Sequence, residues 1–398
     1  MGRTLQTSPY PRLPRVAVIV IFLMLVSFME SVGQAQTMNI LYSFSHVDGS
    51  QPSAPLLMDS QGNLYGTTQA GGANTFGAVF EVTGPGTEQV LYSFTGGADG
   101  GTPYAGLVMD SAGNLYGTTL YGGSTACGDT GCGVVFKVTP AGVETVVYAF
   151  KGGSDGFYPR GSLMIDDKGN LYGTTQYGGA TGSYGTVFKI SPQGVETLLH
   201  RFTGYPNDGA YPFAGVTADS QGNLYGTTEA GGTYGLGTVY QLSTAGEKIL
   251  YMFTGGADAY PWAGVQRDSY GNLYGTTTGN FGEVYVLTAK GKERVLHTFS
   301  GGADGGLPLG SLIHDPQGGW YSTTSQGGAF GYGTIFRVTL SGEESVVYSF
   351  QGTPDGAQPY AGLIGDAKGN GYGTTFSGGS SNRGAVFEIS PSAFRYRP

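Results

Sequence analysis

One short segment recurs seven times along this chain and constrains its fold more than any other feature. Each copy resembles Gly62-Asn-Leu-Tyr-Gly-Thr-Thr68 and follows an aliphatic stretch that ends in Asp. The copies begin 47 to 56 residues apart, at Gly62, Gly113, Gly169, Gly222, Gly271, Gly318 and Gly369. Such a period is typical of a repeat architecture, in which one unit cannot bury its own apolar face and must pack against its neighbours.

Each repeat is expected to form a small antiparallel sheet. Residues 105–110, 115–119, 134–139 and 145–150 are short segments rich in Val, Tyr, Phe and Thr, without helical periodicity. Turn sequences such as Ser-Ala-Gly-Asn and Pro-Ala-Gly separate them, which indicates four strands joined by turns. A four-stranded unit that recurs about every 51 residues is the pattern of a β-propeller blade.

The two ends of the repeat region predict that the blades close into a ring. The last repeat stops after its third strand, at 385–389, whereas residues 39–44 carry the missing fourth strand with its Tyr-x-Phe pattern. Pairing the two removes an open sheet edge. We therefore predict an all-β, seven-bladed propeller closed by the N-terminal strand. The expected blades span residues 54–94, 105–150, 161–202, 214–253, 263–299, 310–350, and 361–390 together with 38–44.

The fourth strand of each repeat has two characteristic positions. A Phe occupies the second position in all seven repeats, and Tyr occupies the first in five of them. These side chains are expected to pack between blades. His200 and His297 take the Tyr position in the other two repeats, and the simplest interpretation is that they substitute for Tyr rather than catalyse a reaction.

Residues 1–35 differ from the rest and indicate export. Three arginines precede Val16–Met29, a 14-residue apolar run, and Gly33 and Ala35 suit cleavage before Gln36. The run is too short for a spanning helix, which needs about 20 residues, and is typical of a signal peptide. An uncleaved signal anchor is the alternative. Residues 36–398 are then expected to form one monomeric domain without a membrane span, either secreted or periplasmic.

Charge and cysteine content support this compartment. The formal net charge is −9 and no Lys/Arg cluster offers a track for phosphates, so we expect no nucleic-acid partner. The two cysteines, Cys127 and Cys132, lie in one loop, where an oxidising compartment favours a small disulfide. The alternative, a zinc site, is less favoured because two thiols without a nearby His provide half of the usual ligand set.

The order Leu-Tyr-Gly-Thr-Thr, Gly-Gly, Gly-Thr-Val-Phe and Tyr-x-Phe resembles the GloVer tandem repeat of exported bacterial proteins. Tyr184-Gly-Thr-Val-Phe-Lys189 and the seven Gly-Asn-Leu-Tyr-type segments carry the resemblance, which spans about residues 40 to 390. It implies an extracytoplasmic, propeller-like protein and no assigned activity. Residues 389–398 contain no apolar tail, a departure from anchored members that favours a free secreted or periplasmic protein.

The face with long loops is the expected place for a binding site. In a propeller, the loops between strands two and three and those between blades emerge together, and here they include 69–76, 95–104 and 120–131. Blades three to five break the repeat pattern in these loops with aromatic and polar residues, which suit sugar rings and their hydroxyl groups; blade-to-blade packing is the alternative. The candidate binding residues are Tyr158, Arg160, Tyr205, Asn207, Tyr260, Trp262 and Phe281.

A ring of seven inter-blade aspartates offers a second candidate. We expect them to be turn residues that accept backbone N–H bonds. The alternative is a carboxylate ring near the axis that holds Ca²⁺; otherwise no cofactor is expected. The seven are Asp48, Asp99, Asp155, Asp208, Asp258, Asp304 and Asp355. A second set, in the short turns, is expected to be structural: Asp59, Asp110, Asp166, Asp219, Asp268, Asp315 and Asp366.

Evidence for catalysis is sparse. The chain has four His without metal-ligand spacing and no nucleophile motif. Two acids outside the repeat pattern, Glu229 and Glu283, are the candidate catalytic carboxylates. The leading hypothesis is a binding module for an extracellular polysaccharide or protein. A carbohydrate-active hydrolase or lyase is the second hypothesis, and a passive cell-surface structural protein is the third.

Overall fold

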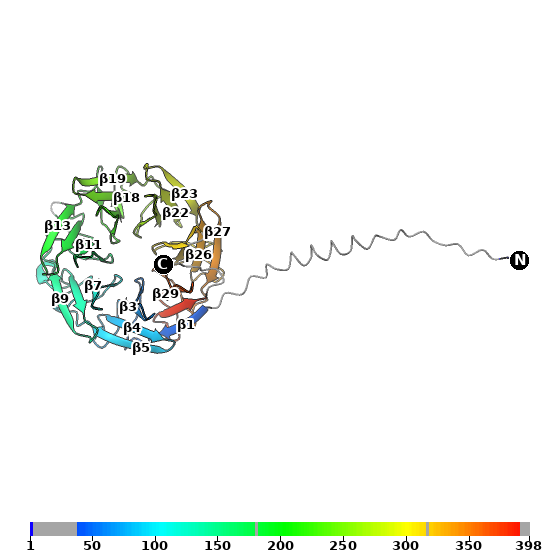
Figure 1. Ribbon diagram of the computed structural model, residues 1–398, viewed down its shortest axis with the longest axis horizontal. Helices are drawn as coiled ribbons and strands as arrows, with labels where there is room; N and C mark the ends of the chain where they lie inside the picture. The colour runs from blue at the N-terminus through cyan, green and yellow to red at the C-terminus, as the bar shows by residue number, and fades with distance from the viewer. Residues whose placement is uncertain (3–37, 180–181, 316–317, 391–398) are drawn as a thin grey trace.

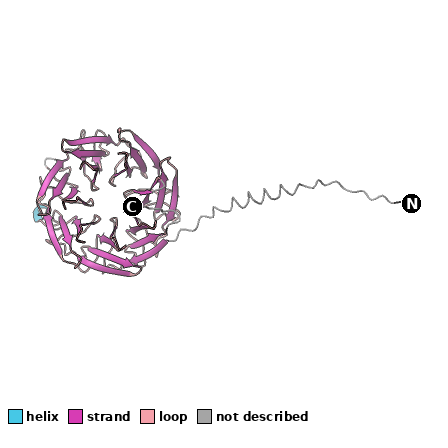
Figure 2. Ribbon diagram, in the orientation of Figure 1, coloured by secondary structure: helices cyan, strands magenta, loops and turns pink. Residues whose placement is uncertain are grey.

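The chain folds into a ring of seven four-stranded antiparallel sheets, as the repeats predict (Figure 1). The computed structural model describes residues 1–2, 38–179, 182–315 and 318–390. The signal segment predicted at residues 1–35 therefore lies almost entirely outside the described residues. Strands form nearly all the regular structure in the described chain, and one short 3₁₀ helix interrupts them (Figure 2).

In the first six blades the strands follow chain order from the centre of the ring to its rim, and in the last blade β1 takes the outer position. The first three blades are β2 (Leu57–Met58), β3 (Leu64–Thr68), β4 (Ala78–Gly84), β5 (Thr87–Ser93); β6 (Val108–Met109), β7 (Leu115–Thr119), β8 (Val134–Val138), β9 (Glu144–Ala149); and β10 (Met164–Ile165), β11 (Leu171–Thr175), β12 (Thr186–Ile190), β13 (Glu196–Arg201). The 3₁₀ helix η1 (Thr125–Cys127) lies in the loop between β7 and β8.

The remaining blades repeat this order. They are β15 (Thr217–Ala218), β16 (Leu224–Thr228), β18 (Thr238–Ser243), β19 (Gly246–Met252); β20 (Gln266–Arg267), β21 (Leu273–Thr277), β22 (Glu283–Leu287), β23 (Glu293–Thr298); β24 (Ile313–Asp315), β25 (Gly319–Thr324), β26 (Thr334–Thr339), β27 (Glu344–Ser349); and β28 (Ile364–Gly365), β29 (Gly371–Thr375), β30 (Ala385–Ile389), with β1 (Met38–Ser43). A two-residue pair, β14 (Gly209–Ala210) with β17 (Ala230–Gly231), joins two loops of the fourth blade.

The ring closes as predicted. β1 pairs with β30 in antiparallel register, from Met38 opposite Ile389 to Ser43 opposite Ala385. In Figure 1 the blue β1 lies beside the red end of the described chain. The first strand of the chain is therefore the outer strand of the last blade, and β30 is not left as an open edge.

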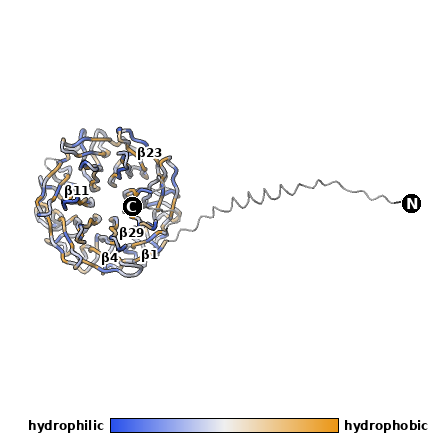
Figure 3. The backbone as a smooth tube through the Cα atoms, viewed as in Figure 1, coloured by the Kyte–Doolittle hydropathy of each residue, from blue (hydrophilic) through white to orange (hydrophobic). Residues whose placement is uncertain are grey.

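The hydrophobic core is divided among the interfaces between blades. Seven buried clusters occur in the described chain, and each joins neighbouring blades. Hydrophobic segments accordingly occur all around the ring (Figure 3). Both faces of every sheet are covered, which explains why the strands do not alternate strictly between apolar and polar residues.

An edge-to-face aromatic pair crosses every interface. The Phe of the Tyr-x-Phe strand packs against the aromatic residue in the third strand of the next blade, with ring centroids 4.9 to 5.4 Å apart. Phe150, for example, is fully buried and contacts Phe188. The same spacing explains the Gly of Leu-Tyr-Gly-Thr-Thr: a Cβ at Gly117 would lie 2.6 Å from Phe136.

The repeated polar residues join and cap the blades. In each blade the first hydroxyl of the Thr-Thr pair donates to a carbonyl of the next blade, for example from Thr67 to Ala105 at 2.9 Å. In the short turns, Asp110 accepts bonds from the N–H groups of Ala112 and Asn114, and Tyr116 donates to it as well. These hydrogen bonds lower the pKa of Asp110 despite the opposing effect of burial.

Candidate binding site

The innermost segments of the blades enclose a central channel with a volume of about 540 Å³. In each blade the chain arrives from the inter-blade loop, passes an X-Pro pair and enters the inner strand. The residue directly after this Pro faces the channel in every blade, on the side of the long loops. These seven residues are Ser53, Tyr104, Arg160, Phe213, Trp262, Leu309 and Tyr360.

The backbone before these residues is held rigidly. The residue before each Pro has a φ between 54° and 60°, and its N–H donates to a carbonyl of the preceding blade, as Tyr158 does to Cys132 and Tyr260 does to Leu236. Non-glycine residues adopt this left-handed conformation at some cost, so it persists where the surroundings fix it. The residues that line the channel are therefore well positioned for recognition.

Four of these residues form a continuous stack across blades two to five. The Arg160 guanidinium lies against the rings of both Tyr104 and Phe213, at 5.0 and 4.6 Å from their centroids, and these two rings also meet edge to face with centroids 5.9 Å apart. On its other side Phe213 stacks on Trp262, with centroids 4.7 Å apart and an interplanar angle of 16°. Arg160 Nε is buried without a hydrogen-bond partner. The stack thus places the Arg160 cation among three aromatic rings, and its Nε–H is free to donate a hydrogen bond.

Glu229 is the acidic partner of this stack. It follows the Thr-Thr pair at the end of β16, and its N–H donates to the carbonyl of Tyr211. Burial raises the pKa of the Glu229 carboxyl, while a hydrogen bond from the Trp262 indole and the charge of Arg160 oppose this rise. Glu229, Trp262 and Arg160, which the sequence suggested separately, thus interact with one another; Trp262 and Arg160 line the channel, and Glu229 is not among its lining residues.

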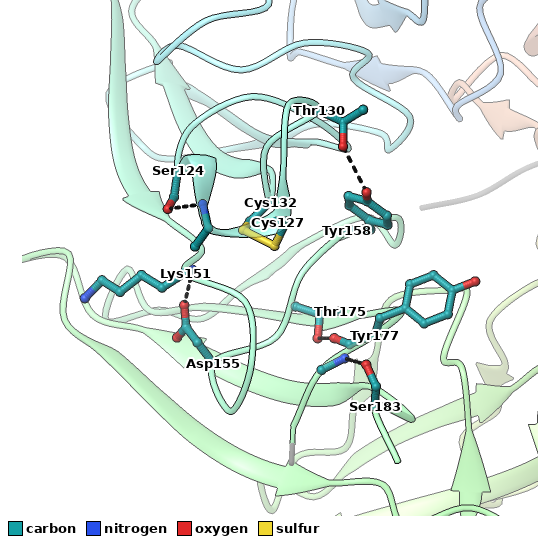
Figure 4. Close-up of a disulfide and its surroundings, with 12 residues drawn as sticks. Ser124, Cys127, Thr130, Cys132, Lys151, Asp155, Tyr158, Thr175, Tyr177 and Ser183 are labelled. Carbon is teal, nitrogen blue, oxygen red and sulfur yellow. Dashed lines mark hydrogen bonds between the residues drawn. A yellow bond between two sulfur atoms is a disulfide. The ribbon is translucent and has the colours of Figure 1, made fainter. Parts of the chain in front are cut away.

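The other candidate binding residues lie outside the channel. Tyr205, Asn207, Tyr260 and Phe281 are exposed on the long loops, and Phe281 covers Gly301 of the next loop. Tyr158 donates to or accepts from Thr130 at 3.1 Å, as Figure 4 shows. It also joins an aromatic cluster of blades two to four that consists of Tyr121, Phe157, Tyr158, Tyr177, Tyr184 and Tyr211.

The loops on this face are also tied to one another. In six blades the inter-blade loop pairs with the loop after the second strand, as Gly101 does with Tyr121 and Phe157 does with Tyr177. The predicted disulfide is present between Cys127 and Cys132 and fixes the longest of these loops locally (Figure 4). The alternative of a zinc site at these two residues is therefore excluded.

Glu283 lies away from the channel residues. It begins β22, at a position that holds Thr, Ala or Val in the other blades, and is 3% exposed. Burial raises the pKa of its carboxyl to about 8, and the charges of Asp258 and Glu293 add to this effect. One carboxylate oxygen, Oε1, has no hydrogen-bond partner. Glu229 and Glu283 are therefore not a pair that faces one substrate.

The seven inter-blade aspartates do not form a ring at the axis. None of them lines the channel; each accepts the N–H of a residue in its own loop or an adjacent one, as Asp99 does from Thr95 and Asp155 does from Lys151. Most also accept a bond from the Tyr of the outer strand, for example from Tyr148 to Asp155 at 2.7 Å. The arrangement follows the turn interpretation and offers no shared Ca²⁺ site near the axis.

Several site residues escaped the sequence analysis. Tyr104 and Phe213 complete the stack, and Tyr360 stacks on Phe376 at the opposite side of the channel, with centroids 4.6 Å apart. One feature of the sequence could have identified them. The residue after the X-Pro pair differs from blade to blade, whereas the sequence is otherwise repetitive.

The chain belongs to the Gloeobacter/Verrucomicrobia repeat family, whose model matches residues 28–240 and 215–397. No curated protein matches it. Among solved structures it is similar to the extracellular domain of the putative one-component system BT4673 from B. thetaiotaomicron, at 10% identity and a TM-score of 0.56. That alignment covers 89% of this chain and 40% of the other, so this chain spans less than half of that structure.

Two further structures show weaker similarity. A putative gluconolactonase aligns over 92% of this chain and 95% of its own, at 13% identity and a TM-score of 0.45. TolB from Acinetobacter baumannii aligns over 72% of this chain and 62% of its own, at 11% identity and a TM-score of 0.44. At these identities and TM-scores, neither similarity says anything about the activity of this chain. Within the described ranges, no helix has the length and apolarity to cross a membrane.

Proposed function

We propose that this propeller is an extracytoplasmic binding module for a polysaccharide, which it holds at the end of the channel on the long-loop face. The observation that carries the proposal is the Tyr104–Arg160–Phe213–Trp262 stack with its acidic partner Glu229. Ligand sites typically combine apolar and aromatic walls with a few oriented polar groups. Aromatic rings can cover the apolar face of a sugar, while Arg160 and Glu229 can bond its hydroxyl groups.

Exposed aromatic residues extend this surface outward. Large rings at least 41% exposed occur in the long loops of several blades: Phe76, Tyr205, Tyr234, Tyr260, Phe281, Phe330 and Tyr332. A polymer that enters the channel end with one unit can rest further units on such rings. This supports a polysaccharide over a small ligand. The disulfide and the signal-like segment at residues 1–35 support secretion or a periplasmic location.

Replacement of Trp262 tests the proposal. In a panel of soluble polysaccharides, we expect the unmodified chain to bind one class, and Trp262→Ala to weaken that binding at least 10-fold, about 1.4 kcal/mol. Calorimetric titration measures the affinity. Tyr270→Ala is the matched control, because Tyr270 is 84% exposed in a short turn on the opposite side of its blade. Equal affinity of the Trp262→Ala variant and the unmodified chain would refute a site at the stack.

A carbohydrate-active hydrolase is the second candidate, and one observation favours it. Glu229 has a raised pKa beside Trp262, as a general acid requires. A glycosidase, however, uses two carboxyl groups across the scissile bond. Among the described residues that line the channel there is no Asp or Glu. The geometry therefore supports binding better than hydrolysis.

Glu229→Gln separates the two functions. We expect this variant to keep polysaccharide binding within a few-fold, because the Gln oxygen can still accept the Trp262 indole bond, and we expect no turnover in either form. Reducing-end assays of the bound polysaccharide measure turnover. Release of new reducing ends by the unmodified chain, lost in Glu229→Gln, would establish the hydrolase instead.

A further inference from the structure

The Tyr position of the outer strand has a defined partner at the interfaces between blades. In five blades its phenol donates to the Asp of the following loop, at 2.7 to 3.1 Å in the four pairs from Tyr92–Asp99 to Tyr348–Asp355. The exceptions are His200 in β13 and His297 in β23. A His at this position replaces a hydroxyl donor with an imidazole nitrogen, which is also a metal ligand.

His200 does not form the close hydrogen bond to the inter-blade Asp that Tyr forms in five other blades. His200 Nε2 lies 3.4 Å from Asp208 Oδ2, beyond the 2.7–3.2 Å range of a good N–H···O bond. Asp208 Oδ2 already accepts the N–H and the hydroxyl of Thr203, and Oδ1 accepts the N–H of Gly209. His200 Nε2 is buried without a satisfactory partner.

The carboxylate of Glu247, which belongs to the next blade, lies close to both His200 and Asp208. Glu247 lies in β19, and its Oε1 is buried without a hydrogen-bond partner. One ligand atom from each of His200, Asp208 and Glu247 lies within 4.8 Å of the other two. In the described parts of the chain, no other group of three such residues meets this condition. The three residues come from the third blade, the loop that follows it and the fourth blade.

We propose that His200, Asp208 and Glu247 bind a zinc ion that joins the third and fourth blades. Ligands about 2.0–2.1 Å from a tetrahedral ion are separated by roughly 3.3 Å, which agrees with the His200–Asp208 distance. Two carboxylates and one neutral imidazole carry a charge of −2, which a divalent cation balances. The imidazole favours Zn²⁺ over Ca²⁺ and Mg²⁺, which prefer oxygen ligands.

The chain contains its own matched comparison. His297, Asp304 and Glu344 occupy the equivalent positions between the fifth and sixth blades, and His297 Nε2 also lies 3.4 Å from Asp304 Oδ2. Their ligand atoms do not form a group as compact as that of His200, Asp208 and Glu247. The proposal therefore assigns the tighter site to His200 and makes His297 the control position.

His200→Tyr is the decisive variant, since five blades already carry Tyr at this position with an Asp partner. The full chain is stripped with a chelator and titrated with ZnCl₂ by calorimetry. We expect one tight site in the unmodified chain, at least a 100-fold loss of affinity at that site in His200→Tyr, and retention of the site in His297→Tyr. Mg²⁺ should not compete at equal concentration.

Co²⁺ substitution gives a second readout. The visible absorption of bound Co²⁺ should be present in the unmodified chain and in His297→Tyr, and absent in His200→Tyr. Should His200→Tyr fail to fold, Glu247→Gln serves the same purpose with an expected 10-fold or greater loss. The proposal is overturned when the unmodified chain binds no zinc, or when His200→Tyr and Glu247→Gln bind it as tightly as the unmodified chain.

Discussion

A chain that begins at Ser45 is expected to lose more than about 5 kcal/mol of folding free energy relative to one that begins at Met38. The deletion removes β1, which pairs with β30 along its length and closes the ring. It also removes Phe44, which is fully buried and packs on Phe80 of the first blade. Truncation of one buried Phe alone costs about 3–5 kcal/mol, and the deletion further exposes the backbone edge of β30.

Urea unfolding followed by circular dichroism measures this loss. The stability of a protein is typically about 5–15 kcal/mol, so the shorter chain is expected to be marginally folded or unfolded in water. Phe44→Ala in the longer chain should show an intermediate loss. A synthetic peptide of residues 38–44 should restore part of the stability of the shorter chain, and the same peptide with Phe44→Asp should not. Equal midpoints for the two chains would show that the ring does not depend on its closing strand.

The sequence predicted the ring because each of its determinants is repeated. The period, the Tyr-x-Phe strand and the division of the last blade between the two ends of the chain are visible without coordinates. The split blade was decisive, since only closure gives residues 385–389 a partner in residues 39–44. The same logic correctly favoured hydrogen-bonding roles for the aspartates of the short turns, which bond their own turns as repeated residues do.

The candidate site was only partly predictable, for a physical reason. Trp262 and Arg160 stood out as departures from the repeat, but their neighbours Tyr104 and Phe213 each resemble ordinary aromatic residues in a strand-rich chain. The stack exists because four consecutive blades aim one position at a shared axis. Contacts between positions about 50 residues apart depend on the radius and twist of the ring, which the repeat period does not specify.

The geometry of the ring also brings together acidic residues that are far apart in the sequence. The outer strand of a blade begins with Glu near the inter-blade Asp of the preceding loop, as Glu144 does near Asp99 and Glu247 does near Asp208. Burial raises the pKa of both glutamates to about 7, and the neighbouring aspartate adds to the rise. Folding therefore brings these carboxyl groups into surroundings that oppose their ionisation.

Glu283 has a more strongly raised pKa than either of these glutamates. We therefore expect Glu283→Thr to stabilise the protein at high pH. The unfolded carboxyl titrates near 4.5 and the folded one at about 8. Between these values the folded state binds more protons, so its stability falls as the pH rises from 4.5 to 8 and the full cost remains above pH 8. Thr occupies the equivalent position in three other blades, for example Thr238, whose hydroxyl bonds Thr228 at 2.8 Å.

We expect Glu283→Thr to add about 2–4 kcal/mol to the free energy of unfolding at pH 9, below the roughly 5 kcal/mol that the full pKa difference would give. At pH 4, where Glu283 is protonated in both states, this gain should vanish. Urea unfolding of both chains at pH 4, 7 and 9 measures the difference, with Glu343→Gln as the control at an exposed position. Parallel pH profiles for the unmodified chain and Glu283→Thr would show that the Glu283 carboxyl is ionised in the folded protein at little cost, and that the blade relaxes to hydrate it.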